Sequence, residues 1–268
     1  MPLPMVEFPP NRNYQPLTRA QLRKRYGPSN PLYPILETLA RSDVCDLVDD
    51  DFKGTLNADI WSVANSGGAG AADFVAVADA PLGKIRGDPG TTNDGDVRLI
   101  GRENTTANRR PVLVGRIGTN DTVVTASKFE FGFIDASAAA GAVLVKATPT
   151  STATDYAVII RDTNDSTSVD LVADGGTDAI IKVVSSPGIT FAARTWYDLM
   201  IALNEQKEEV FYIDGVYQGI ARRGPDVTVT LAPWVNCTTR ASDTWELDVD
   251  FIKGWCERVP FSGNAFTT

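Results

Sequence analysis

Apolar and polar residues alternate with a period of two along most of the chain after residue 46, which is the pattern of β-strands that bury one face. The clearest stretch is 195–219. Its first strand places three apolar residues at alternate positions, Leu199, Ile201 and Leu203. A charged turn follows, and the next apolar run ends at Asp214-Gly215, a pair that favours a tight hairpin because glycine tolerates positive φ. This stretch therefore predicts three consecutive antiparallel strands.

Similar short apolar runs, separated by Gly, Asn, Asp, Ser and Thr turns, continue through the rest of this region. We expect further strands at 74–78, 97–101, 112–117, 128–135, 142–146, 156–161, 168–173, 179–184, 197–203, 210–213, 216–221, 227–231 and 245–255. The glycine-rich segments 65–72 and 86–96 are expected to be loops. Because the run contains no helical stripe of useful length, the sequence predicts one all-β sandwich of two antiparallel sheets over 46–268.

The first 45 residues have a different texture, since half of the 16 prolines lie before residue 35. Proline holds φ and removes a hydrogen-bond donor, so we expect an extended arm over 1–45. It can hold one or two short helices. One starts at Thr18, and the other starts at Asn30-Pro31 with an apolar stripe, Leu32, Ile35, Leu36 and Leu39. An arm this short needs another surface, on its own chain, a sister subunit or a different protein, to bury its apolar residues.

Charge divides the chain at the same place. The net charge is −9, but residues 1–45 hold six basic and three acidic residues, a net of +3, which leaves −12 for the rest. A basic arm on an acidic body favours docking on an acidic partner, although a solvated tail remains the alternative. The basic pieces lack aromatic interleaving or zinc spacing, so we expect no nucleic-acid module.

The absence of histidine excludes Ser-His-Asp and Cys-His nucleophilic chemistry and His-ligated zinc. The three cysteines include no Cys-x-x-Cys, so no disulfide framework is implied; Cys237 and Cys256 either pair or stay as buried thiols. No apolar run has membrane-spanning length and no signal peptide is recognisable, so we expect a protein folded in a cytoplasm, with no membrane partner.

Several short motifs carry a resemblance to a known fold family. They are Phe52-Lys53-Gly54-Thr55-Leu56 with Trp61, the alternating Phe129, Phe131 and Phe133, Trp196-Tyr197, Ile213-Asp214-Gly215, and the closing strand Leu247-Asp248-Val249-Asp250-Phe251. Over about residues 50–258 the chain resembles concanavalin A-like (laminin G-like) jelly rolls, the lectin and glucanase fold. With its Pro-rich arm it resembles the capsid decoration (cement or head-fibre) proteins of tailed phages.

The best enzyme candidate is the strand that carries Glu246, Asp248 and Asp250 on one face. Retaining glycosidases need two carboxylates about 5–5.5 Å apart, and alternate strand residues approach that spacing. The stretch resembles the Glu-x-Asp-x-Glu strand of laminarinase-like enzymes, but it has Asp250 in the last position and lies near the end of the chain. We interpret it instead as an ordinary strand, with Trp245, Leu247, Val249 and Phe251 in the core and the carboxylates in water.

Binding of calcium or sugar is the remaining chemistry. Acidic runs at 49–51 and 162–165, followed by Asp170 and Asp174, could supply oxygen ligands for calcium, although they are also common turn residues. Tyr217 and Trp234 are the candidate exposed aromatics for a glycan. The other tryptophans are expected in the core, namely Trp61, Trp196, Trp245 and Trp255.

The favoured hypothesis is a non-enzymatic phage virion structural protein, displayed on the capsid exterior after synthesis in the host cytoplasm. Its arm would bind the major capsid protein or sister subunits through aromatic and basic residues, Phe8, Arg12, Tyr14, Arg19, Arg23, Arg25 and Tyr26. The resemblance implies a homo-oligomer, with a trimer as the suggested number, and no obligate cofactor. The alternatives are a glycan-binding adhesin and, further away, a glycosidase that uses Glu246 and Asp250.

Overall fold

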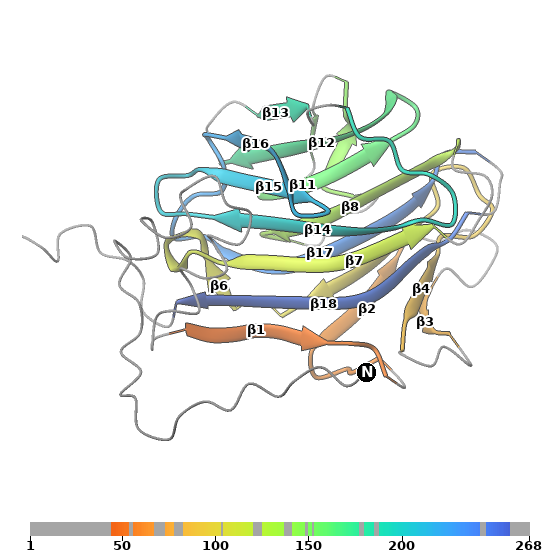
Figure 1. Ribbon diagram of the computed structural model, residues 1–268, viewed down its shortest axis with the longest axis horizontal. Helices are drawn as coiled ribbons and strands as arrows, with labels where there is room; N and C mark the ends of the chain where they lie inside the picture. The colour runs from red at the N-terminus through yellow and green to blue at the C-terminus, as the bar shows by residue number, and fades with distance from the viewer. Residues whose placement is uncertain are drawn as a thin grey trace, which may run out of the picture.

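The protein folds into two antiparallel sheets packed face to face, as the computed structural model shows (Figure 1). It describes residues 44–53, 56–66, 73–77, 83–102, 104–119, 125–136, 141–147, 150–151, 153–176, 180–184, 188–241 and 245–257. The expected arm, with its two short helices and its seven candidate partner-binding residues, lies outside these ranges, apart from the last two positions of the arm. The all-β prediction is confirmed for the described part of the chain.

Sheet A has the strand order β16-β15-β14-β7-β18-β4-β3, and β1 also pairs with β18. Its strands are β1 (Val44–Asp50), β3 (Asp73–Ala76), β4 (Ile85–Asp88), β7 (Val112–Thr119), β14 (Trp196–Leu203), β15 (Glu209–Ile213), β16 (Val216–Ala221) and β18 (Leu247–Glu257). Figure 1 looks onto this sheet, with the other sheet behind it. Strand β1 starts two residues before the expected boundary at 46, so the sandwich begins at Val44 among the described residues.

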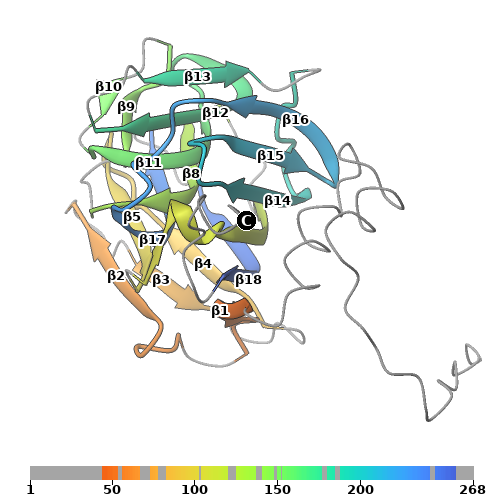
Figure 2. The ribbon, with the colours of Figure 1, turned by 90° about the vertical axis from the view of Figure 1, so that its left-hand side faces the viewer.

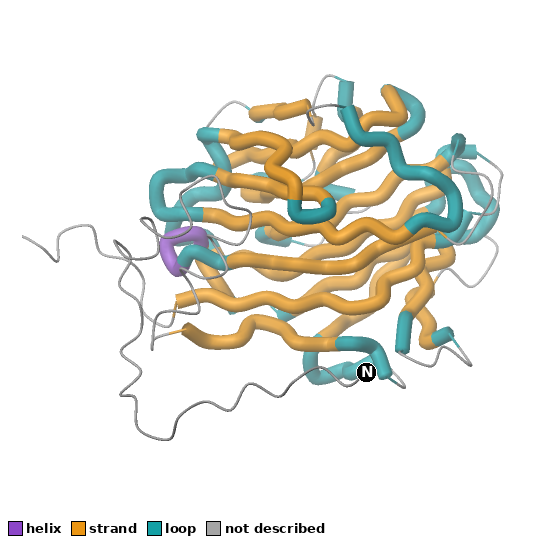
Figure 3. The backbone as a smooth tube through the Cα atoms, viewed as in Figure 1, coloured by secondary structure: helices purple, strands orange, loops and turns teal. Residues whose placement is uncertain are grey.

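Sheet B has the order β13-β12-β11-β8-β17-β5-β2, and β6 also pairs with β17. Its strands are β2 (Trp61–Asn65), β5 (Asp96–Gly101), β6 (Thr105–Thr106), β8 (Ser127–Ile134), β11 (Asp155–Asp162), β12 (Ser166–Gly175), β13 (Ile181–Val184) and β17 (Thr230–Thr239). The short hairpin β9 (Val143–Val145) and β10 (Thr150–Ser151) stands apart from both sheets, and the single described helix is the 3₁₀ turn η1 (Ala107–Arg109). Figure 2 shows the two layers from the side and Figure 3 the predominance of strand over loop.

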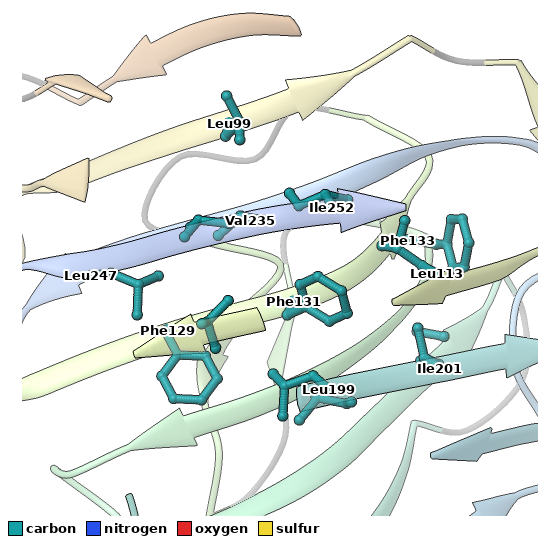
Figure 4. Packing of buried hydrophobic residues seen from close by; sticks show 14 of the residues in the cluster. Leu99, Leu113, Phe129, Phe131, Phe133, Leu199, Ile201, Val235, Leu247 and Ile252 are labelled. Atoms are coloured by element: carbon teal, nitrogen blue, oxygen red, sulfur yellow. The ribbon is translucent and has the colours of Figure 1, made fainter. Parts of the chain in front are cut away.

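The core fills the space between the sheets with the residues that alternation predicts. Phe129, Phe131 and Phe133 of β8 face Leu199 and Ile201 of β14 across the sandwich, all fully buried (Figure 4). Trp61 and Trp245 also lie in this core, as expected. Burying this apolar area from water is the main force that holds the two sheets together.

The three-strand prediction for 195–219 is confirmed by β14, β15 and β16, which pair in sequence order. Asp214 and Gly215 have φ angles of 51° and 73°, so both central residues of the turn adopt the left-handed region that this hairpin requires. No described helix is long and apolar enough to span a bilayer.

Two segments differ from the sequence prediction. The expected loop 86–96 starts as strand β4, and the strand expected at 227–231 is instead β17, which runs to Thr239. The sequence prediction ended this strand before Pro233, because proline is rare within a central strand. It is tolerated here because it lies where the neighbour of β17 changes from β6, paired at Leu231, to β5, paired from Trp234.

Cys237 is a buried free thiol, so the disulfide with Cys256 is not formed. Its sulfur contacts the Gly87 carbonyl oxygen at 3.6 Å, and burial in the core raises the pKa of the thiol well above its usual value.

Candidate functional site

The outward-facing side of sheet B is closed by the chain itself. Glu130 of β8 is fully buried there, and its carboxylate accepts hydrogen bonds from the backbone N–H groups of Ala142 (2.7 Å) and Val143 (2.9 Å). Lys128 lies 3.0 Å from the same carboxylate and is equally buried. The segment that carries Ala142 and Val143 therefore covers this face, held by a buried ion pair that has its hydrogen bonds satisfied.

Trp234 belongs to this closed face. Its indole N–H donates to Glu130 at 2.9 Å, and the side chain has no exposed surface. The prediction that Trp234 is an exposed sugar-binding ring is therefore wrong. The residue seemed to lie near a strand end, whereas it sits inside β17 beneath the 141–147 segment.

The outward-facing side of sheet A carries an exposed ring instead. Trp196, the first residue of β14, is 42% exposed, which corrects its expected place in the core. A Cβ added to Gly118 of β7 would lie 3.0 Å from the indole ring, so the ring rests directly on the glycine backbone. A side chain at Gly118 would displace the ring, so the glycine is the contact surface, or seat, on which the indole of Trp196 packs.

Charged residues border this ring on the same face. Arg116 lies between Asp198 (Nε to Oδ1, 2.7 Å) and Asp250 (Nη1 to Oδ2, 3.5 Å), and its guanidinium is 5.5 Å from the centre of the Phe251 ring. Hydrogen bonding to Asp198 raises the pKa of Arg116 above its usual value. These side chains offer donors and acceptors in one row beside Trp196.

A second charged group flanks Trp196 toward β4. Asp248 contacts Lys84 at 2.7 Å and the Nε of Arg86 at 2.8 Å, and a further Arg86 nitrogen lies 3.1 Å from Glu246. Hydrogen bonding to Asp248 raises the pKa of Arg86. The Lys84 ammonium lies 6.0 Å from the centre of the Trp196 ring, so it forms the edge of the site.

Glu246, which precedes β18, and Asp248 and Asp250 within it share the outer side of the sheet, as alternation predicted, but Asp248 is buried in ion pairs and does not face water. In a glycosidase one carboxyl group acts as acid in surroundings that favour its protonated form. Here Glu246 and Asp250 each face an arginine.

A register shift between Val249 and Phe251 changes the predicted facing of β18. It turns Phe251 outward, toward Arg116, and places Ile252 in the core instead. The sequence pattern alone did not reveal this bulge, because the residues on both sides of it are apolar.

Tyr217 lies on the same side of sheet A, at the β15–β16 hairpin. It is 47% exposed, and its ring meets that of Tyr212 edge-on at 5.7 Å between centroids. Burial raises the pKa of Tyr212. Tyr217 thus has the exposure that a sugar-stacking residue needs, at some distance along the face from Trp196.

The acidic runs proposed for calcium have other partners. Asp50 accepts hydrogen bonds from the Phe52 N–H and the Trp61 indole, and Asp162 forms an ion pair with Arg240. Among the described residues, no three carboxylates or thiols converge into a group that would hold a metal ion.

Comparisons with known proteins agree on the fold. No protein-family model and no curated protein sequence matches this chain. Many solved structures do match. The carbohydrate recognition domain of Emp47p is 8% identical, with a TM-score of 0.53, and the match covers 82% of this chain and 97% of that one.

Two further structures are associated with sugar-cleaving enzymes. One, described with endo-acting O-glycanases of the human gut microbiota, is 10% identical, with a TM-score of 0.56 and coverage of 79% and 99% of the two chains. A Bacteroides ovatus GH16 protein, in complex with a mixed-linkage glucan product, is 11% identical, with a TM-score of 0.52 and coverage of 78% and 99%. At these identities the likeness establishes the architecture: the chain has the concanavalin A-like jelly-roll fold found in lectins and glucanases.

Proposed function

We propose that the sandwich binds carbohydrate on the outer face of sheet A and does not cleave it. The observation that carries this proposal is Trp196, an exposed ring in contact with Gly118 and bordered by charged side chains. A sugar ring stacks its apolar C–H face on an aromatic side chain while its hydroxyl groups hydrogen-bond to polar neighbours. Arg116, Asp198 and Lys84 supply those neighbours.

The carbohydrate recognition domain of Emp47p and the two glycanase-associated proteins share the architecture, which supports a sugar as the ligand class by analogy. The absence of cleavage is argued from the ion pairs. Glu246 is held by Arg86 and Asp250 by Arg116, and both carboxylates would have to leave these partners to act as acid and nucleophile.

A glycan array with the full chain and Trp196→Ala tests the proposal. We expect a defined set of glycans to bind the parent protein and the affinity to fall at least roughly tenfold in the variant, because truncating a central aromatic commonly costs about 2 kcal/mol. Val75→Ala is the matched control, since Val75 is also exposed on sheet A but carries no ring. Unchanged binding by Trp196→Ala would place the sugar elsewhere, and release of sugar by the parent but not by Glu246→Gln would favour the glycosidase.

For the whole chain we propose a role as a non-enzymatic phage virion structural protein, a capsid decoration protein whose arm binds capsid or sister subunits. The observation in favour is the contrast between the +3 arm and the −12 remainder, together with the start of β1 at the edge of the β18 pairing, where the arm joins the sandwich. An arm that binds only the assembled capsid would stabilise the assembled state by linkage.

Comparing the full chain with a chain that starts at Asn30 tests this role, because the shortened chain loses all seven candidate partner-binding residues and keeps the segment that leads into β1. We expect the full chain to co-sediment with capsids and the shortened chain to stay folded but remain in the supernatant. Equal co-sedimentation would exclude the arm as the anchor. Light scattering on the same pair checks whether the arm also drives oligomer formation.

A further inference from the structure

Sheet A carries a second, apolar surface on its outer face, away from Trp196. We call it the apolar patch, and it consists of Val112, Val114, Met200, Ala202, Val210, Tyr212 and Trp255. These residues alternate with core residues such as Leu113 and Ile201, so they point away from the sandwich interior.

The patch forms one continuous row across neighbouring strands. Val112 of β7 pairs with Ala202 of β14 on one side and with Trp255 of β18 on the other, and Ala202 pairs with Val210 of β15. The row begins beside β1, where Asp46 pairs with Trp255. With about 4.8 Å between strands, the four steps from β1 to β15 span roughly 19 Å.

The apolar patch is nevertheless shielded from water. Val112 is 3% exposed, Tyr212 4%, and Met200 and Ala202 7% each, values expected of a core and not of the outer face of a sheet. The indole N–H of Trp255 is also buried, and it has no hydrogen-bond partner among the residues that the structure describes. A buried donor costs free energy unless an acceptor lies against it, so both facts point to a layer of chain on the patch.

We propose that residues 30–43 of the same chain form this layer, as an amphipathic helix that leads into β1. The apolar stripe Leu32, Ile35, Leu36 and Leu39 gives a helix in this segment one apolar face to bury. A helix of about ten residues is roughly 15 Å long, which matches the row from Trp255 to Ala202 and Val210. Three residues remain before Val44, and they reach about 10 Å, enough to turn from the patch into the edge strand.

Two other segments compete for the patch. Residues 258–268 continue from β18 at the same end of the sheet, but they hold two phenylalanines five positions apart and no helical stripe. The 30–43 segment of a second copy has the right chemistry, but its own chain offers the same segment only a few residues from the patch. Proximity therefore favours the chain's own segment.

The proposal divides the outer face of sheet A into a half covered by the chain and a half left to a ligand. Trp196 of β14 and Arg116 of β7 lie further along these strands than Ala202 and Val112, at the end of the sheet where β4 pairs with β18. A helix over Val112 and Ala202 therefore leaves them accessible. The inference is independent of the sugar proposal, because it concerns different residues and a different readout.

Thiol labelling of Ala202→Cys in the full chain tests the cover, with the modified residue identified by peptide mass spectrometry. We expect slow labelling in this parent variant and labelling at least roughly tenfold faster after adding Leu36→Asp, because a charge in the stripe detaches the helix. The matched control adds Thr38→Asp, which lies off the stripe and should leave the rate unchanged. The buried Cys237 monitors folding, since its labelling should remain slow in every variant.

Equal labelling with and without Leu36→Asp would overturn the proposal. So would protection that is lost when the chain is stopped after Glu257, which would assign the cover to 258–268. Protection that disappears on dilution would assign it to a second copy. If Leu36→Asp also exposes Cys237, the milder Leu36→Ala replaces it, and an unchanged rate with that variant and a folded core would also overturn the proposal.

Discussion

The two outer faces of the sandwich differ in how they surround their tryptophans. On sheet B the chain covers its own strands, and Glu130, Lys128 and Trp234 are sealed beneath the 141–147 segment. On sheet A another tryptophan, Trp196, is exposed to water and packs against Gly118. The comparison shows that an aromatic ring on an outer face is buried where a segment distant in the sequence covers it. It stays available for binding where no such segment does.

The polar groups on the two faces differ in the same way. Glu130 is wholly buried and gains three hydrogen bonds and a lysine, so removing any partner would leave a buried charge unsatisfied. Arg116 is 42% exposed at its side chain, where water screens its contact with Asp198. Substitutions of Glu130, Lys128 or Trp234 should therefore change stability, and those of Arg116 and Asp198 should change binding.

The largest expected effect is that of Trp234→Ala. Removing a buried ring and leaving Glu130 without its indole donor should lower the free energy of unfolding by about 3–5 kcal/mol. Chemical denaturation measures the change. Tyr217→Ala is the control on the open face, where we expect about 0.5 kcal/mol or less. A loss below about 1 kcal/mol for Trp234→Ala would contradict the closed face.

Glu209 tests what a buried carboxyl does without the partners that Glu130 has. Among the described residues, no other residue gives the Glu209 carboxyl a hydrogen bond, and burial raises its pKa from 4.5 to about 9. Below pH 4.5 Glu209 is protonated in both the folded and the unfolded protein, and its contribution to stability is greatest. As the pH rises toward 9, the unfolded form ionises first, so stability falls by an amount on the order of a few kcal/mol.

Glu209→Gln should remove this slope, because the amide does not titrate. Thermal unfolding of both proteins between pH 5 and pH 9 measures it, and the difference between them isolates Glu209 from other groups. Parallel pH profiles for the two proteins would show that the Glu209 carboxyl has found a partner or ionises in the folded state.

Gly118→Val targets the seat of Trp196 and none of the charged groups. A Cβ at this position lies 3.0 Å from both the indole ring and the Thr195 carbonyl oxygen, so the ring must move. We expect about 1–3 kcal/mol lower stability and at least a roughly tenfold weaker sugar affinity. Calorimetric titration with the best glycan from the array measures the affinity. Full affinity in a folded Gly118→Val protein would remove the seat from the proposal.

Arg116→Gln should also have only a small effect on stability. The contact with Asp198 is exposed to solvent and that with Asp250 is partly exposed, so the free energy of unfolding should fall by less than about 1 kcal/mol, and less in high salt. Denaturation at two salt concentrations measures this. A loss comparable with that of Trp234→Ala would mean that the two faces are energetically alike.

The period-two pattern was sufficient to predict the sandwich, because the alternation of apolar and polar residues in each strand shows which of its faces is buried. Trp196 shows that part of the site was also readable. It shares parity with Asp198, while Leu199, Ile201 and Leu203 take the core positions, so its outward direction follows from the same alternation. The general tendency of tryptophan to be buried pointed the other way and predicted the wrong side.

Other features depended on the tertiary structure. The sequence determined the strands, the Asp214-Gly215 hairpin and the alternation that sets inner and outer residues, since these follow from neighbours along the chain. Only the fold decided that Trp234 is covered, that Phe251 turns outward and that Pro233 is tolerated in a central strand. The physical reason is that a covering segment, a bulge and a change of strand neighbour are each set by residues far away in the sequence, which local alternation does not register.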